Sequence, residues 1–114
     1  MAECLFCKIA AGTVPAKIVH QDDAVIAFRD LRPQAPVHVL VIPRRHIATV
    51  NDLEGPDADL VGRLFLVARQ IAKAEAIAES GYRLVMNTNA QAGQSVLHIH
   101  LHLMGGRYMG WPPG

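Results

Sequence analysis

The residues best suited to chemistry are three histidines at alternate positions near the end of the chain, His98, His100 and His102. They alternate with apolar residues over positions 96–103, a pattern typical of a half-buried β-strand. Period-two geometry would place the three imidazoles on one face of that strand and the apolar side chains on the other. Because histidine is not a favoured strand residue and protonated neighbours would repel one another, we interpret the pattern as a chemical one.

Two kinds of chemistry fit such a strand. Two imidazoles could hold a catalytic zinc, with His38 as a third ligand, although the outer pair would lie about 13 Å apart and all three rings could hardly meet one metal. The alternative is nucleophilic catalysis by one imidazole. The turn over 92–95 favours this alternative, because Gly93 lets backbone N–H groups approach an anion and Ser95 adds a hydroxyl. We therefore expect a phosphate pocket beside the imidazoles.

A pair of cysteines, Cys4 and Cys7, stands near the start of the chain with two residues between them. The first residues lack the pattern of a signal peptide, and no apolar run is long enough to span a bilayer, so we expect a cytoplasmic protein with no membrane partner. In that compartment the thiols stay reduced. Their spacing favours metal binding or redox work over a structural disulfide.

The composition indicates one globular unit. The chain has 114 residues, of which 51% are hydrophobic and 18% are charged, enough apolar material for one core, and we expect a single domain over 1–114. The formal net charge is +1, and no window carries a basic run. Nucleic acid is therefore not an expected partner.

The order of the elements predicts an α+β fold. Short turns between the strands favour an antiparallel sheet of five strands. A short N-terminal helix over 5–11 would end at Gly12, and one long helix would open at Gly55-Pro56-Asp57 and end at Ser80-Gly81. The expected strands span 17–21, 24–29, 37–42, 82–88 and 96–103.

Taken together, these features resemble the histidine triad (HIT) family, and within it the HINT branch of purine nucleoside phosphoramidases. The similarity covers nearly the whole chain. The residues that carry it are Phe28-Arg29-Asp30, Pro33-Gln34-Ala35-Pro36, the segment from His38 to Pro43, Asn87, Gly93-Gln94-Ser95-Val96, the triad from His98 to Leu103, Gly105-Gly106-Arg107 and Trp111-Pro112-Pro113-Gly114.

The resemblance implies a reaction and assigns its residues. His100 would attack the α-phosphorus of a nucleoside 5′-phosphoramidate, form a nucleotidyl-histidine and release the nucleoside monophosphate to water, with no metal required. His38 would hold the tautomer of the nucleophile, and Ser95 is placed to assist the leaving amine. The resemblance also places Asp30 and Leu31 at the ribose, and it places Asn87, Gly93, Gln94, Ser95 and His102 around the phosphate.

Some HIT proteins begin with the same cysteine pair and resemble zinc binders. The matching ligands here would be Cys4, Cys7, His46 and His98, a closed set of two thiolates and two imidazoles that is typical of a structural zinc. In that case His98 would leave the catalytic group. The alternative is two reduced thiols without metal, with His46 in a proton relay.

Three functions remain open at this point. The first is the phosphoramidase, which the ending Trp111 to Gly114 favours; the second is a dinucleoside polyphosphate hydrolase or nucleotidyl transferase of the same family. The third is a nucleotide-binding or partner-binding module without turnover. The lone Trp111 suggests that the tail lies across the partner of a homodimer. Val14, Ile18 and Phe28 are expected to line an apolar and unselective base pocket.

Overall fold

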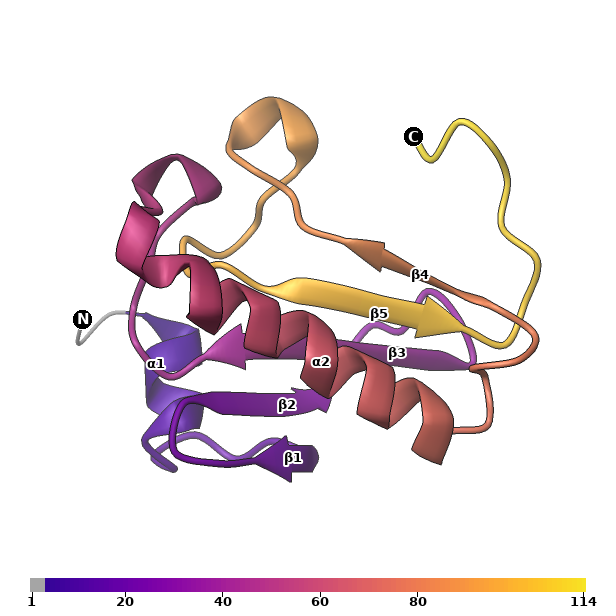
Figure 1. Ribbon diagram of the computed structural model, residues 1–114, viewed down its shortest axis with the longest axis horizontal. Helices are drawn as coiled ribbons and strands as arrows, with labels where there is room; N and C mark the ends of the chain where they lie inside the picture. The colour runs from indigo at the N-terminus through magenta and orange to yellow at the C-terminus, as the bar shows by residue number, and fades with distance from the viewer. Residues whose placement is uncertain (1–3) are drawn as a thin grey trace.

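A five-stranded antiparallel sheet in the order β1-β2-β3-β5-β4 forms the centre of the computed structural model, which describes residues 4–114. Helix α2 lies across one face of the sheet, and α1 lies on the other face (Figure 1). The predicted α+β fold, with one long and one short helix, is confirmed. The elements are α1 Leu5–Ala10, β1 Ile18–Gln21, β2 Val25–Arg29, β3 Val37–Pro43, α2 Ala58–Ala74, β4 Tyr82–Val85 and β5 Leu101–Gly105.

Alternation along the central strands divides the core into two layers. In β3, Val39 and Val41 pack in the layer beneath α2, while Leu40 and Ile42 pack in the layer beneath α1. Leu101 and Leu103 of β5 belong to the α2 layer. The residues between them, including His38 and His102, therefore face the α1 side, where a site can form.

The histidine segment is only partly a strand, which corrects the strand expected over 96–103. The ladder between β3 and β5 ends with Val41 opposite Leu101. The next residue of β3 whose backbone would bond to β5 is Pro43, which has no N–H to donate. His98 and His100 lie in the irregular segment before β5. Ile99 is buried as expected, but Leu97 is 57% exposed and does not join the core.

Strand β4 is also shorter than the predicted 82–88. Its last partner is His102, opposite Val85, and β5 begins one residue earlier at Leu101. With no ladder left to extend, the chain leaves the sheet after Val85. Asn87 and the loop that follows it are consequently free of strand geometry.

Helix α2 ends at Ala74, well before the predicted stop at Ser80-Gly81. Ala76 takes the left-handed conformation with φ 61°, and the backbone N–H of Ile77 donates to the carbonyl of Ala72 at 3.0 Å, as in a Schellman cap. Glycine is the residue usually found at this position, and for that reason the sequence pattern predicted the helix end at Gly81. None of the helices in residues 4–114 is long and apolar enough to cross a bilayer.

Candidate active site

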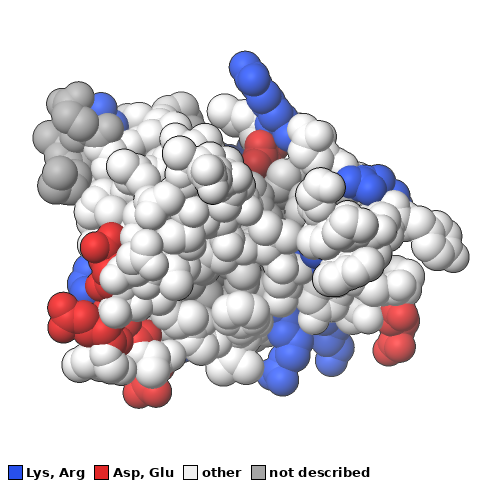
Figure 2. Space-filling view, turned by 90° about the horizontal axis from the view of Figure 1, so that it is seen from above, with Lys and Arg blue, Asp and Glu red and all other residues white. Residues whose placement is uncertain are grey.

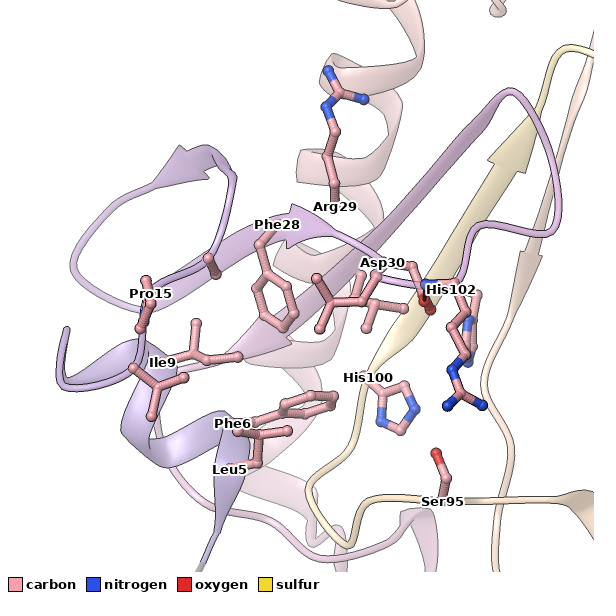
Figure 3. Close-up of a pocket in the computed structure, with 15 residues that line it drawn as sticks. Leu5, Phe6, Ile9, Pro15, Phe28, Arg29, Asp30, Ser95, His100 and His102 are labelled. Carbon is pink, nitrogen blue, oxygen red and sulfur yellow. Dashed lines mark hydrogen bonds between the residues drawn. The ribbon is translucent and has the colours of Figure 1, made fainter.

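A cavity of about 280 Å³ opens between α1 and the sheet. Figure 3 shows that apolar side chains of α1, of the loop that follows it and of β2 line one end, while His100, His102, Asp30 and Ser95 gather at the opposite end. An apolar slot that leads to imidazoles is suited to a planar ring with a phosphate at its end. The lining residues are Leu5, Phe6, Ile9, Val14, Pro15, Ala16, Phe28, Arg29, Asp30, Leu31, Arg32, Leu40, Ser95, His100 and His102.

His100 is buried, and its ring is oriented by the backbone of its own segment. Its Nδ1 lies 2.8 Å from the carbonyl oxygen of His98, and since a carbonyl can only accept, Nδ1 carries the proton and donates. Nε2 of the neutral ring then holds a free lone pair. The ring of Phe6 packs edge-on against His100 at a centroid distance of 5.0 Å. Nε2 is therefore the nitrogen of His100 whose lone pair is available to a ligand or a reacting group.

The resemblance implied that His38 would hold the tautomer of His100. In the structure His38 forms a pair with His102 instead. The backbone N–H of Gln34 donates to Nδ1 of His38 at 3.0 Å, so a neutral His38 carries its proton on Nε2. That nitrogen lies 2.9 Å from Nδ1 of His102. His102 accepts there and keeps its own proton on Nε2, which makes it a hydrogen-bond donor within the pocket that it lines.

Burial keeps this pair neutral. Removal from water lowers the pKa of His102 to about 4, with the positive charges of protonated His100 and His38 as further causes and Asp30 acting in the opposite sense. Burial likewise lowers the pKa of His38, against the pull of Asp30. A neutral His102 can donate one hydrogen bond and accept another, which the tautomer assignment requires.

Asp30 stands at the end of β2, where its carboxylate has two partners. Oδ1 accepts the backbone N–H of Arg32 at 2.7 Å, and Oδ2 lies 3.5 Å from Nε2 of His38. Both Asp30 and the almost fully exposed Leu31 line the cavity, as expected of residues near a sugar. Asp30, His38 and His102 are close enough to hold a metal, but the hydrogen bonds among them already account for their proximity.

The turn before the histidines offers fewer phosphate donors than the sequence suggested. The backbone N–H of Gly93 donates to the carbonyl of Ala90 at 3.0 Å, and that of Gln94 donates to the carbonyl of Asn89 at 3.1 Å. Both amides are therefore used inside the turn. Of the predicted phosphate-binding residues in this turn, Ser95 lines the cavity.

Gly93 and Gln94 instead shape the loop. Gly93 has φ 83°, a conformation that glycine adopts without strain. The side chain of Gln94 donates to the carbonyl of Ala48 at 2.7 Å and accepts from the backbone N–H of Asn89 at 2.8 Å. Asn87 is half-buried beyond β4 and is not among the residues that line the cavity.

The apolar end of the cavity depends on α1, which the sequence reasoning missed. Val14 and Phe28 line it as expected, but Ile18 does not. Phe6 and Ile9 of α1 complete the wall, and the ring of Phe6 packs edge-on against Phe28 at 5.4 Å. Their spacing of three residues on a short amphipathic helix is the signal that could have identified them.

The second group of reactive side chains joins α1 to two distant segments. Sulfur and imidazole atoms of Cys4, Cys7, His46 and His98 all lie within 4.8 Å of one another. Nε2 of His98 donates to the carbonyl of Pro43 at 2.8 Å, which leaves Nδ1 with a lone pair directed at the sulfurs. The predicted cluster of two cysteines and two histidines is therefore present as a group.

The fold and the paired imidazoles place the chain in a known class. Residues 11–109 match the HIT domain family, and the chain belongs to that family. The chain is 54% identical over 108 residues to the purine nucleoside phosphoramidase of Escherichia coli strain K12, covering 95% of this chain and 91% of that protein. The predicted family is thus confirmed.

Solved structures agree with this placement. A HIT family hydrolase from Legionella pneumophila is 55% identical and superposes with a TM-score of 0.97, covering 98% of this chain and all of that one. A histidine triad nucleotide-binding protein from Candida albicans is 30% identical, with a TM-score of 0.83 over 96% of this chain and 83% of that one. The similarity therefore covers the whole site, including α1.

Proposed function

We propose that the protein is a purine nucleoside phosphoramidase, a hydrolase that cleaves the P–N bond between a nucleoside 5′-phosphate and an amine. The observation that carries the proposal is the lone pair on Nε2 of His100, fixed by the bond from Nδ1 to the His98 carbonyl at the polar end of a cavity with an apolar slot. Its similarity to the enzyme of Escherichia coli supports the same reaction.

In the first step, Nε2 of His100 attacks the α-phosphorus, a P–N bond to the imidazole forms, and the P–N bond to the leaving amine breaks. The imidazole becomes positively charged, and its Nδ1–H bond to the His98 carbonyl stabilises that charge. Nε2–H of His102 donates to a phosphoryl oxygen. Preorganised donors of this kind lower the barrier without rearranging during the reaction.

The leaving amine needs a proton, and the nucleotidyl group needs water. The hydroxyl of Ser95 lines the cavity near His100 and can relay a proton to the departing nitrogen, giving up its own proton as it takes one from solvent (Figure 3). Water then attacks the phosphorus and the bond to Nε2 breaks. The proton that the water loses returns to solvent, the nucleoside monophosphate is released, and neutral His100 is regenerated. The ring of Phe6 excludes solvent from the opposite side of the imidazole.

A turnover assay tests this function. Adenosine 5′-phosphoramidate and diadenosine polyphosphates are offered to wild type, His100→Ala and the control His20→Ala, whose imidazole bonds Asp22 outside the cavity. We expect the wild type and the control to cleave the phosphoramidate preferentially, and His100→Ala to lose about 10³-fold or more in kcat. Undiminished cleavage by His100→Ala would refute the nucleophile, and preferential cleavage of the polyphosphates would establish the second function instead.

We also propose that Cys4, Cys7, His46 and His98 hold a structural zinc. Ligand atoms of a tetrahedral zinc with two sulfurs and two nitrogens lie roughly 3.5 Å apart. Here the distances from sulfur to Nδ1 are 3.3 Å for Cys4 to His98, 3.4 Å for Cys7 to His46 and 3.5 Å for Cys7 to His98. The donor set fits zinc, which would join α1 to the segment before His100 and take no part in the reaction.

Elemental analysis of protein purified without added zinc tests this proposal. We expect about one zinc per chain in wild type and in His20→Ala, and a loss in the double variant Cys4→Ser, Cys7→Ser. Less than about a tenth of a zinc per chain in the wild type would contradict it. Reduced thiols are needed for this site, in keeping with the cytoplasmic location that we propose.

Finally, we propose a homodimer that covers the β4 edge and the tail. Trp111 is 84% exposed and Tyr108 is fully exposed, an unfavourable state for large aromatic side chains. β4 is an edge strand whose outer side is unpaired in the described residues. Viewed from that side, the surface is largely uncharged, with Lys, Arg, Asp and Glu near its margins (Figure 2).

Sedimentation tests the assembly. The chain has a mass of 12.4 kDa, and we expect a particle of twice that mass. Deleting residues 111–114 should release part of the dimer, while Trp111→Phe should keep it. A monomeric intact protein would contradict the proposal.

A further inference from the structure

We propose that Arg32 makes the cavity selective for phosphoramidates whose leaving amine carries a carboxylate, as an amino acid joined through its nitrogen does. This inference rests on the proposed function and names the class of substrate for it. It is carried by the charges of the residues that line the cavity, by the way the loop of Arg32 is fixed, and by the position of that loop at the entrance.

Among the described residues, the guanidinium of Arg32 is the one cation at the cavity without a partner. Of the three charged side chains besides histidine that line it, Arg29 is held by Glu75 through two bonds of 2.9 and 3.1 Å. The carboxylate of Asp30 accepts the backbone N–H of Arg32 and lies beside His38. Within residues 4–114, no carboxylate or carbonyl accepts from the guanidinium of Arg32. Its charge is available to a ligand.

The backbone of Arg32 is nevertheless held in place. Its N–H donates to Asp30 at 2.7 Å, and its carbonyl accepts from the side chain of Gln34 at 3.0 Å. The carbonyl of Gln34 in turn accepts from Arg107 at 2.9 Å. A long side chain on a fixed loop pays less entropy on binding than one on a loose loop, so this cation can contribute to selectivity.

Arg32 lines the cavity at its solvent-exposed end, where we place the leaving group. Arg32 is exposed, whereas His100 is 4% exposed and lies inside. If the nucleoside occupies the apolar slot, its phosphorus lies at His100, and the part of the substrate beyond phosphorus would extend past Ser95 and Arg32, which line the same cavity. The phosphoryl oxygens already have Nε2–H of His102 as a donor. The guanidinium is thus better placed for an anion on the amine.

A carboxylate is the anion that fits best. Guanidinium and carboxylate match as planar groups with two parallel hydrogen bonds, and an amine with a cationic substituent would be repelled. A carboxylate one or two bonds from the leaving nitrogen lies within reach of a side chain as long as arginine. An amino acid linked to a nucleotide through its nitrogen has this arrangement.

A matched pair of substrates tests the proposal. Adenosine 5′-phosphoramidates of an amino acid and of its carboxamide have nearly the same shape, and only the first carries a negative charge on the amine portion. We expect wild type to prefer the carboxylate in kcat/KM, and Arg32→Gln to reduce that preference about fivefold or more, with Arg32→Lys between them. Arg69→Gln, an exposed arginine on α2 away from the cavity, is the control and should keep the preference.

Binding of the same two compounds by calorimetry to His100→Ala, with and without Arg32→Gln, makes the test independent of turnover. If wild type cleaves neither compound, the proposed function fails, and a preference for the carboxylate in binding that Arg32→Gln removes still supports this inference. An equal loss for both compounds would overturn it, because Arg32 would then serve the phosphate. No effect of Arg32→Gln on either measurement would also overturn it.

Discussion

The three histidines of the triad differ in which ring nitrogen bonds to the protein and in whether it donates or accepts. His98 donates through Nε2 to Pro43, His100 donates through Nδ1 to the His98 carbonyl, and His102 accepts at Nδ1 from His38. A neutral imidazole has one donor and one acceptor, so each contact fixes what the other nitrogen can do. These contacts leave a lone pair on Nδ1 of His98, a lone pair on Nε2 of His100 and a proton on Nε2 of His102, as the roles that we propose for the three rings require.

This division of roles was only partly predictable from sequence. Alternation identified the three rings, and the resemblance assigned to His100 the role of nucleophile that we propose. The partner of His100 could not be predicted, because it is a backbone carbonyl that exists only once the chain leaves strand geometry at His98. The pairing of His38 with His102 depends on register between β3 and β5, which places His38 opposite Met104 and diagonal to His102.

At the scale of residues, we predict that His38 acts through the hydrogen bond that it donates to His102. His38→Leu should lower kcat about 10-fold to 100-fold, because His102 then loses the donor that sets its tautomer. His38→Gln, whose amide can still donate, should recover a large part of that loss. Steady-state kinetics across pH check this, and an identical defect in both variants would show that His38 matters for packing alone.

At the scale of elements, the site is formed where regular structure stops. Helix α1 provides Leu5 and Phe6 to the cavity, and the segment before β5 provides Ser95 and His100. Hydrophobic periodicity predicted the sheet and α2, because those elements bury continuous apolar faces. It could not predict that Pro43 would end the ladder, since the effect of a missing N–H depends on which strand lies beside it.

The end of β5 offers a test of how tightly the segment after α2 packs on the sheet. A Cβ added to Gly105 would lie 2.6 Å from Cδ1 and 3.2 Å from Cβ of Ile77, so Gly105→Ala should lower the free energy of unfolding by about 1–3 kcal/mol. Ile77→Val removes the nearest atom and should relieve part of that cost in the double variant. Gly62→Ala on the exposed side of α2, where nothing lies within 4 Å, is the control and should not destabilise. Urea unfolding measures all four proteins; strictly additive losses would contradict the contact.

For the whole molecule, burying so many neutral histidines links stability to pH. Removal from water lowers the pKa of His38, of His98 and, to about 4, of His102, each from an ordinary value of 6.5. The unfolded chain therefore binds more protons than the folded protein between those values. Carboxylates such as Asp22, whose pKa is lowered by His20 and backbone N–H bonds against the effect of burial, respond only at lower pH.

We accordingly predict that the free energy of unfolding of the zinc-free protein falls steadily as pH is lowered from 6.5 toward 4. It should be nearly constant from 6.5 to 8. His102→Gln cannot take up the proton and should show a shallower decline over the same range. Urea unfolding at several pH values measures the slope, and a stability that rises on acidification would contradict the burial of neutral imidazoles.

The central claim is that Nε2 of His100 carries the nucleotide during turnover, and trapping that intermediate tests it most directly. Wild type mixed with adenosine 5′-phosphoramidate is quenched within milliseconds into alkaline denaturant, and its peptides are mapped by mass spectrometry. We predict adenylyl groups on His100, and none at any histidine in His100→Ala. Adenylylation of another histidine, or release of AMP by wild type with no labelled peptide at any time, would contradict the account.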